Sequence, residues 1–244
     1  MRLHNLVYTT AYTHMRLHNM KTIAVVNQKG GVGKSTTAAA LASGLSLRGF
    51  NVLSIDLDAQ SNLTYALGAA GSNKTALRVL TGETTATEAR TKTYAGDIIP
   101  ASKALSAADS ILTDTGKEYR LREALDAIKP EYDFIVIDSP PALGILTVNA
   151  LTAADSVIIP AQADIFSIQG IEQLSHTIRQ VKKYTNPDLN IKGILLTRYN
   201  PRAVLSRDAQ GITTKLAAGI GTKVFSATIR EAIAVKEAQI TKEG

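Results

Sequence analysis

A glycine-rich segment between an apolar run and a helical pattern constrains this 244-residue chain more than any other feature. Residues 22–27 are mostly apolar and predict a buried parallel strand, whereas residues 37–47, rich in Ala and Leu, predict a helix. The segment that joins them reads Gln28, Lys29, Gly30, Gly31, Val32, Gly33, Lys34, Ser35 and Thr36. A strand, a glycine-rich turn and a helix in this order indicate an α/β fold built on a parallel sheet.

The same segment has the composition of a phosphate-binding loop. Its glycines allow backbone N–H groups to converge on phosphate oxygens where a Cβ atom would intrude. The N-terminus of the following helix adds further N–H groups and a positive dipole end. In such a loop Lys34 reaches the β- and γ-phosphates, and Ser35 places its hydroxyl on Mg²⁺. Residues 29–36 therefore predict a site for a nucleoside triphosphate with Mg²⁺.

Two departures from the usual phosphate loop point to a subclass. Gln28 stands where the usual pattern has its first glycine, and a second lysine, Lys29, precedes the paired glycines. This arrangement resembles the deviant Walker A box of the ParA/MinD family of P-loop ATPases. In that family the extra lysine reaches across a dimer interface to the partner's nucleotide. The resemblance implies that Lys29 and Lys34 both act in catalysis and that the active form is a homodimer with ATP.

Two aspartates follow the next predicted strand, residues 52–57. Asp56 and Asp58 alternate with Leu57, so both point to the same side of an extended chain. They lie at the carboxyl end of the strand, where open α/β sheets bind ligands. The resemblance extends here, because ParA-like proteins carry Asp-x-Asp-Pro-Gln at this point, although Ala59 replaces the proline. It implies that Asp58 aligns the attacking water and that Asp56 lies near the metal.

A third strand end carries one more carboxylate. Residues 134–138 are apolar up to Asp138, which predicts a buried strand that delivers this side chain to the same edge of the sheet. The segment resembles a Walker B box, in which Asp138 bonds to the Mg²⁺ shell, with Ser139 where the family commonly has cysteine. Pro140 and Pro141 end the strand. Three motifs in order predict an ATP hydrolase, and we expect slow turnover without a partner.

The rest of the chain alternates strand and helix patterns, which predicts a doubly wound, mostly parallel sheet flanked by helices. Further strands are expected at residues 96–100, 156–160 and 191–196, and helices at 76–80, 86–90, 121–128 and 167–184. Residues 20–244 are expected to form one P-loop ATPase domain. Residues 1–19, in which the first five recur at 15–19, are expected to be a disordered leader or start-site extension. The family usually continues beyond residue 239, so we expect this domain to lack a final C-terminal helix.

Composition argues against several classes of protein. The sequence has no cysteine, which excludes a disulfide framework, an iron–sulfur cluster and a thiolate zinc site. This separates the chain from the nitrogenase iron protein within the same superfamily. No apolar run approaches the length of a membrane span, and residues 236–244 show no amphipathic stripe for a membrane surface. We therefore expect a cytoplasmic, nucleoid-associated protein without a membrane partner.

Contacts with the base and with DNA are expected late in the chain. MinD-like relatives have an Asn-Arg-Tyr segment that faces adenine, and the resemblance implies this position for Arg198 or Asn200. A formal net charge of +6 is compatible with salt-sensitive DNA binding. ParA relatives bind DNA nonspecifically through basic residues in two regions; Arg202 matches the first, and Arg230 and Lys236 match the second loosely. A solvated basic face without a partner is the alternative interpretation.

Taken together, the motifs predict a ParA/Soj-type ATPase for plasmid or chromosome partition. Such a protein would bind Mg-ATP, dimerise, coat DNA nonspecifically and be stimulated by a ParB-like centromere-binding protein. Three alternatives stay open at this stage: a positioning ATPase for protein cargo, a MinD-like membrane-surface ATPase, and a nucleotide-binding regulator without useful turnover.

Overall fold

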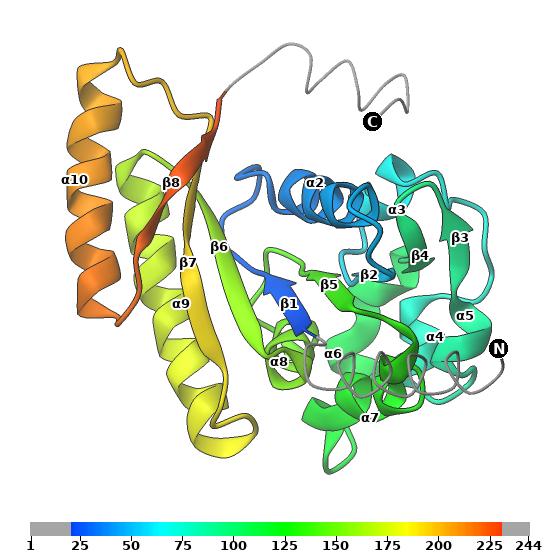
Figure 1. The fold of residues 1–244 in the computed structure, drawn as a ribbon. Helices are drawn as coiled ribbons and strands as arrows, with labels where there is room; N and C mark the ends of the chain where they lie inside the picture. The colour runs from blue at the N-terminus through cyan, green and yellow to red at the C-terminus, as the bar shows by residue number, and fades with distance from the viewer. Residues whose placement is uncertain (1–20, 231–244) are drawn as a thin grey trace, which may run out of the picture.

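The computed structural model describes residues 21–230, through which one eight-stranded sheet runs (Figure 1). The strands are β1 (Lys21–Val25), β2 (Val52–Asp56), β3 (Thr91–Thr93), β4 (Gly96–Ile99), β5 (Phe134–Asp138), β6 (Ser156–Gln162), β7 (Asn190–Thr197) and β8 (Val224–Ile229). Their order across the sheet is β3-β4-β2-β5-β1-β6-β7-β8. Every neighbouring pair is parallel except β3 and β4, which are antiparallel.

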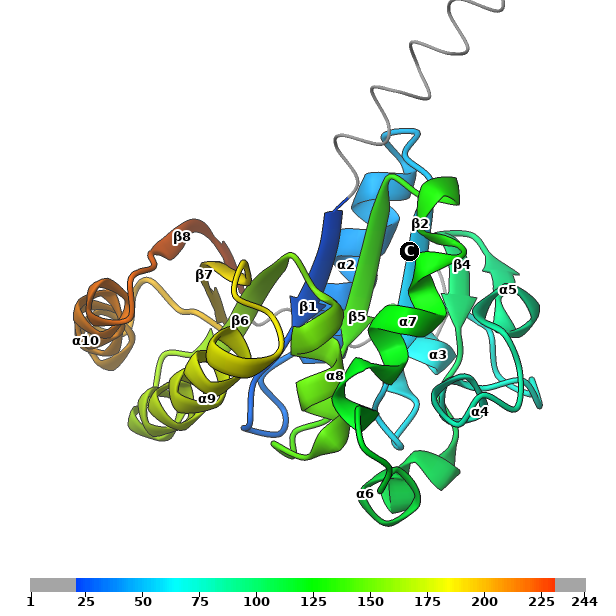
Figure 2. The ribbon, with the colours of Figure 1, turned by 90° about the horizontal axis from the view of Figure 1, so that it is seen from below.

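Helices cover both faces of this sheet, as a doubly wound fold requires. The α-helices are α2 (Lys34–Ser46), α3 (Asn62–Ala66), α4 (Ala76–Leu80), α5 (Ala86–Ala89), α6 (Ala108–Ile111), α7 (Arg120–Asp126), α8 (Ile145–Ala153), α9 (Ile165–Tyr184) and α10 (Val204–Gly219). Helix α2 lies on one face, and α7, α8 and α9 lie on the opposite face (Figures 1 and 2). Short 3₁₀ turns, η1 (Lys103–Ala107), η2 (Lys117–Tyr119) and η3 (Lys129–Glu131), complete the connections.

The central strands are buried on both faces, which explains their nearly continuous apolar sequences. In β5, Ile135 and Ile137 belong to the larger core cluster. Val136, which points to the other side, packs in a second cluster with Ala38 and Ala42 of α2. Successive residues of one strand therefore contribute to two separate cores. This double burial fixes the strand ends, and with them the loops that follow.

The sheet reverses its direction of winding between β1 and β6. The chain leaves β1 toward β2 on one side, whereas it leaves β6 toward β7 on the other. Open α/β sheets bind ligands at the carboxyl ends of the strands at such a switch point. The same edge receives two carboxylates, because Asp56 and Asp138 are register partners at the ends of β2 and β5.

The fold class predicted from the sequence is confirmed: the sheet is mostly parallel and doubly wound. The helix expected after the glycine-rich loop is observed as α2, which begins at Lys34, where that loop ends. The edge strands β3 and β8 and the helices α3, α6, α8 and α10 were not assigned from the sequence. The predictions for residues 1–19, for Lys236 and for a missing final helix lie outside the described residues. Within residues 21–230 no helix is long and apolar enough to cross a membrane.

Candidate nucleotide-binding site

The glycine-rich loop connects β1 to α2 at the switch point of the sheet. Gly31 and Gly33 adopt φ values of +74° and +84°, in the left-handed region that side chains other than glycine rarely enter. A Cβ atom at Gly30 or Gly31 would meet nothing within 4 Å, so open space lies beside this part of the loop. Gly33 precedes α2 without any side-chain cap, and the first turn of α2 carries no acidic residue. The loop and helix therefore form a cradle suited to an anion.

Lys34, the first residue of α2, lies inside this site. It is buried, with 6% of its surface exposed, and its Nζ donates to the carbonyl oxygen of Lys29 at 3.3 Å. Burial lowers its pKa, while the charges of Asp138 and Asp58 oppose that shift. The ammonium therefore lies between the loop and the strand-end aspartates, where it can neutralise added negative charge.

Asp56 is buried at the end of β2, and protein groups already occupy both of its oxygens. Oδ1 accepts from the Asp58 backbone N–H at 3.0 Å. Oδ2 accepts from the backbone N–H and the hydroxyl of Thr64, at 2.8 and 2.7 Å. Burial raises its pKa to about 6 in spite of these hydrogen bonds. Asp56 thus fixes the turn from β2 to α3, and with it the position of Asp58.

Asp58 follows that turn and is 8% exposed. Its Oδ1 accepts from the backbone N–H of Gln60 at 3.0 Å. The two aspartates therefore form a chain of contacts, in which Asp56 holds the backbone of Asp58 and the following turn orients its carboxylate. This arrangement leaves Asp58 at the carboxyl edge of the sheet, near Lys34.

Asp138 differs from Asp56 because both of its buried oxygens lack a hydrogen-bond partner among the described residues. Burial, followed by the charge of Asp56, raises its pKa well above the usual range, and Ser35 and Lys34 oppose only part of the shift. A buried carboxylate without partners is costly, and a hydrated divalent cation beside Ser35 would remove that cost. No cluster of three or more acidic, His or Cys side chains able to hold a metal occurs in residues 21–230. Mg²⁺ suits such a site, because it keeps several waters and takes phosphate oxygens as ligands.

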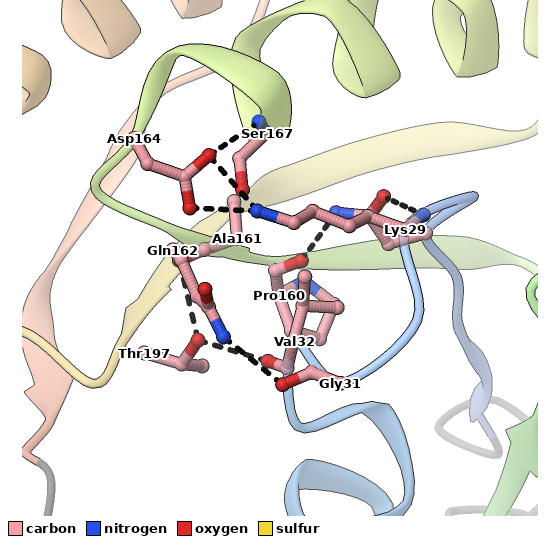
Figure 3. A network of polar contacts seen from close by, with 10 residues as sticks. Lys29, Gly31, Val32, Pro160, Ala161, Gln162, Asp164, Ser167 and Thr197 are labelled. Atoms are coloured by element: carbon pink, nitrogen blue, oxygen red, sulfur yellow. Dashed lines mark hydrogen bonds and ion pairs between the residues drawn. The ribbon is translucent and has the colours of Figure 1, made fainter.

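Lys29 points toward the connection between β6 and α9 (Figure 3). Its Nζ lies 2.9 and 2.7 Å from the two carboxylate oxygens of Asp164. The same carboxylate accepts from the backbone N–H of Ser167 at 2.8 Å and so caps α9. Burial opposes ionisation of Asp164, yet Lys29 and Ser167 hold its pKa below the usual value. Lys29 is therefore anchored within its own chain, next to the phosphate loop.

Three side chains that contact the loop were not predicted from the sequence. They are Asp164, which pairs with Lys29, and Gln162 and Thr197, which donate to carbonyl oxygens of the loop. Asp164 immediately precedes a long helix, which is a recognisable N-cap signal. Nothing in the local sequence marks the other two.

The residues expected near the base and near DNA line one open cavity of about 620 Å³. Its lining consists of Arg198, Tyr199, Asn200, Pro201, Arg202 and Arg230. The cavity lies at the carboxyl ends of β7 and β8, on the same edge of the sheet as the phosphate loop. The structure thus brings together the residues predicted for adenine and two of those predicted for DNA.

Comparison with known proteins gives consistent matches. A family model described as an AAA domain matches residues 20–191. The chain is 41% identical over 231 residues to the chromosome partitioning protein ParA of Caulobacter vibrioides, covering 92% of this chain and 85% of that protein. It is 43% identical over 190 residues to the sporulation initiation inhibitor protein Soj of Bacillus subtilis, covering 76% and 75%. A structure of cobyrinic acid a,c-diamide synthase from Mycobacterium smegmatis with bound ATP analog and magnesium has a TM-score of 0.81 at 36% identity, covering 91% and 93%.

Proposed function

The chain belongs to the ParA-type partition ATPases, and we propose that it is a slow Mg-ATPase that dimerises on ATP and binds DNA nonspecifically. In this proposal Mg-ATP occupies the cradle formed by residues 29–36. Two chains then associate face to face, and each Lys29 reaches the nucleotide of the other chain. A ParB-like partner stimulates hydrolysis and releases the dimer from DNA, so that plasmid or chromosome cargo moves.

The position of Lys29 carries this proposal. Lys34 already lies between the phosphate loop and the aspartates, so one lysine is available to the nucleotide of its own chain. Lys29 stands five residues earlier, yet its ammonium is paired with Asp164 at the start of α9. The long, flexible side chain of Lys29 can leave Asp164 and bind the phosphates of the nucleotide held by a second chain. Dimer formation is then linked to the presence of ATP, because the exchange requires a phosphate partner.

Each remaining site residue has a distinct proposed role in hydrolysis. Lys34 and Lys29 neutralise the charge of the phosphates, and Asp58 orients the attacking water with its carboxylate fixed by the turn after β2. Asp138 and Ser35 would hold the Mg²⁺ shell, and the ion would neutralise charge on the transferred phosphoryl group. Asp56, the register partner of Asp138, would lie near the metal, and its carboxylate accepts from the backbone N–H of Asp58.

Two arginines of the open cavity provide the proposed DNA surface. Arg202 and Arg230 lie beside Arg198 and Asn200, at the edge that also carries the phosphate loop. Backbone phosphates of DNA bind to such clusters without regard to sequence, and the binding weakens with salt. Arg198 or Asn200 is assigned to the base of ATP, so occupation of the nucleotide site would arrange the neighbouring DNA contacts.

DNA co-sedimentation of the full-length chain with ATP, ADP or no nucleotide tests this proposal. We expect DNA to pellet with the protein only in ATP and less at higher salt. Arg202→Ala should weaken the binding and lower the salt dependence by about one unit of slope. The matched control is Arg122→Ala, which removes an exposed arginine on α7 and should have no effect. Binding that is indifferent to nucleotide, or absent while ATP binds, would contradict the proposal.

A further inference from the structure

Two side chains from outside the glycine-rich loop hold its carbonyl groups (Figure 3). The hydroxyl of Thr197 donates to the carbonyl oxygen of Val32 at 2.8 Å, and it lies 3.3 Å from that of Ala161. The side-chain amide of Gln162 donates to the carbonyl oxygen of Gly31 at 3.0 Å. Thr197 and Gln162 are the last residues of β7 and β6, so the loop is tied to two strands on the far side of the switch point.

These contacts determine where the amide hydrogens of the loop point. In a planar trans peptide, the C=O of one residue and the N–H of the next point in opposite directions. Thr197 holds the Val32 carbonyl toward β7 and therefore turns the Gly33 N–H away from that strand. Gln162 holds the Gly31 carbonyl toward β6 and therefore turns the Val32 N–H away from β6. Phosphate binding by such a loop depends on N–H groups, so each contact prepares one donor.

Each of the two peptides concerned is flanked by a glycine and can rotate readily. Gly31 and Gly33 both have positive φ, and glycine passes between backbone regions with little steric penalty. Without an anchor, the flanking peptides would sample several orientations, and the ligand would have to order them on binding. The methyl carbon of Thr197 lies 3.7 Å from the place where a Cβ of Gly33 would be, so this side chain lies directly beside the loop.

We propose that Thr197 is a positioning residue for nucleotide binding, which holds the Gly33 N–H toward the phosphates, and that Gln162 does the same for the Val32 N–H. The inference rests on the proposed nucleotide site and adds two residues that lie outside its motifs. Thr197 has the larger effect, because it is 2% exposed and its hydrogen bond is shielded from water. Gln162 is half-buried, so water competes for its contact.

The test is a titration of the full-length chain with a fluorescent ADP and a fluorescent ATP in Mg²⁺. Thr197→Val keeps the shape of the side chain and removes the hydroxyl, and should weaken binding of both nucleotides about tenfold. Thr197→Ser restores the hydroxyl and should recover most of the affinity. The matched control is Thr222→Val, since the Thr222 hydroxyl also donates at 2.8 Å to a distant carbonyl, that of Ile191, at the opposite end of β7. It should change nucleotide affinity less than twofold.

The outcomes separate positioning from general destabilisation. The unfolding midpoint without nucleotide should fall by similar amounts in Thr197→Val and Thr222→Val, while only the former loses affinity. If Thr197→Val does not fold, Gln162→Met serves instead, with an expected loss of about threefold. Wild-type nucleotide affinity in Thr197→Val would overturn this inference and leave the proposed function standing. The same holds if Thr197→Ser or Thr222→Val loses as much nucleotide affinity as Thr197→Val. A wild-type chain that binds no nucleotide would overturn the proposed function as well.

Discussion

The ion pair between Lys29 and Asp164 leads to a quantitative prediction about dimerisation. If Lys29 must leave Asp164 to reach the partner's nucleotide, the pair stabilises the monomer and opposes the dimer. Asp164→Asn removes the charge and keeps the N-cap of α9, because asparagine caps helices about as well as aspartate. The variant should therefore dimerise more tightly in ATP while its helix stays intact.

The contacts of Lys29 give the expected size of this effect. Its ammonium lies within 2.9 Å of both carboxylate oxygens, and the two side chains are 28% and 33% exposed. A partly exposed pair of good geometry contributes about 1 kcal/mol. Two such pairs break when two chains associate, so the substitution should strengthen dimerisation by about 2 kcal/mol. This corresponds to a dimer dissociation constant that is lower by about 30-fold. The gain should shrink as salt screens the pair.

Sedimentation velocity over a range of protein concentrations, with Mg²⁺ and a non-hydrolysable ATP analogue, measures this constant. Asp126→Asn provides the control, because it removes one negative charge from an exposed pair with Lys129 and should leave dimerisation unchanged. A dissociation constant in Asp164→Asn that equals or exceeds the wild-type value would refute the reasoning. It would mean that Lys29 does not leave Asp164, or that Asp164 contributes to the dimer itself.

Four further predictions concern the charged groups of the site and one hydrogen-bond partner of Asp56. Lys34→Met should lower the affinity for Mg-ATP at least about 100-fold in equilibrium titrations, because a charge-assisted phosphate contact is lost in a buried place. Burial raises the pKa of Asp138, so protons compete with Mg²⁺ for its carboxylate; Mg²⁺-dependent nucleotide affinity should therefore fall as pH is lowered, while Mg²⁺-free ADP binding changes less. Without ligand, the contribution of Asp56 to the free energy of unfolding should grow as pH falls, because its folded pKa of about 6 exceeds the ordinary value of 3.8. This contribution is complete below about pH 4 and is lost as pH rises through 6. Urea unfolding at several pH values measures it. Thr64→Val should lower the free energy of unfolding by about 1–3 kcal/mol at pH 7.5, because a buried carboxylate loses the hydroxyl it accepts from, and an unchanged urea midpoint would contradict that assignment.

The elements that the sequence predicted well lie in the middle of the sheet. The strand expected at residues 134–138 is observed with those bounds, because a strand buried on both faces must be apolar throughout. Strand β3 at the edge escaped prediction, since Thr91–Thr93 are partly exposed and carry no apolar pattern. It forms because the tight hairpin at Gly96, with φ of +98°, returns the chain onto β4. Its stability is a property of the pairing and not of its own residues.

The candidate site shows the same division between local and tertiary information. Lys34, Asp58 and Asp138 stand in motifs whose spacing along the chain is itself the signal. Asp164 and Thr197 reach the loop from 135 and 165 residues away. No periodicity connects such positions, and only the order of β1, β6 and β7 in the sheet brings them together.

Mixing two inactive variants tests most directly whether Lys29 acts across a dimer. Lys29→Ala and Asp58→Ala should each lack ATPase activity when assayed alone with Mg²⁺ and DNA. In a mixed dimer, the chain that keeps Asp58 receives Lys29 from the other chain, so one complete site forms. An equal mixture should recover up to about one quarter of the wild-type rate, since half of the dimers are mixed and each has one working site. Recovery near that level would support the account, and a mixture as inactive as its components would contradict it.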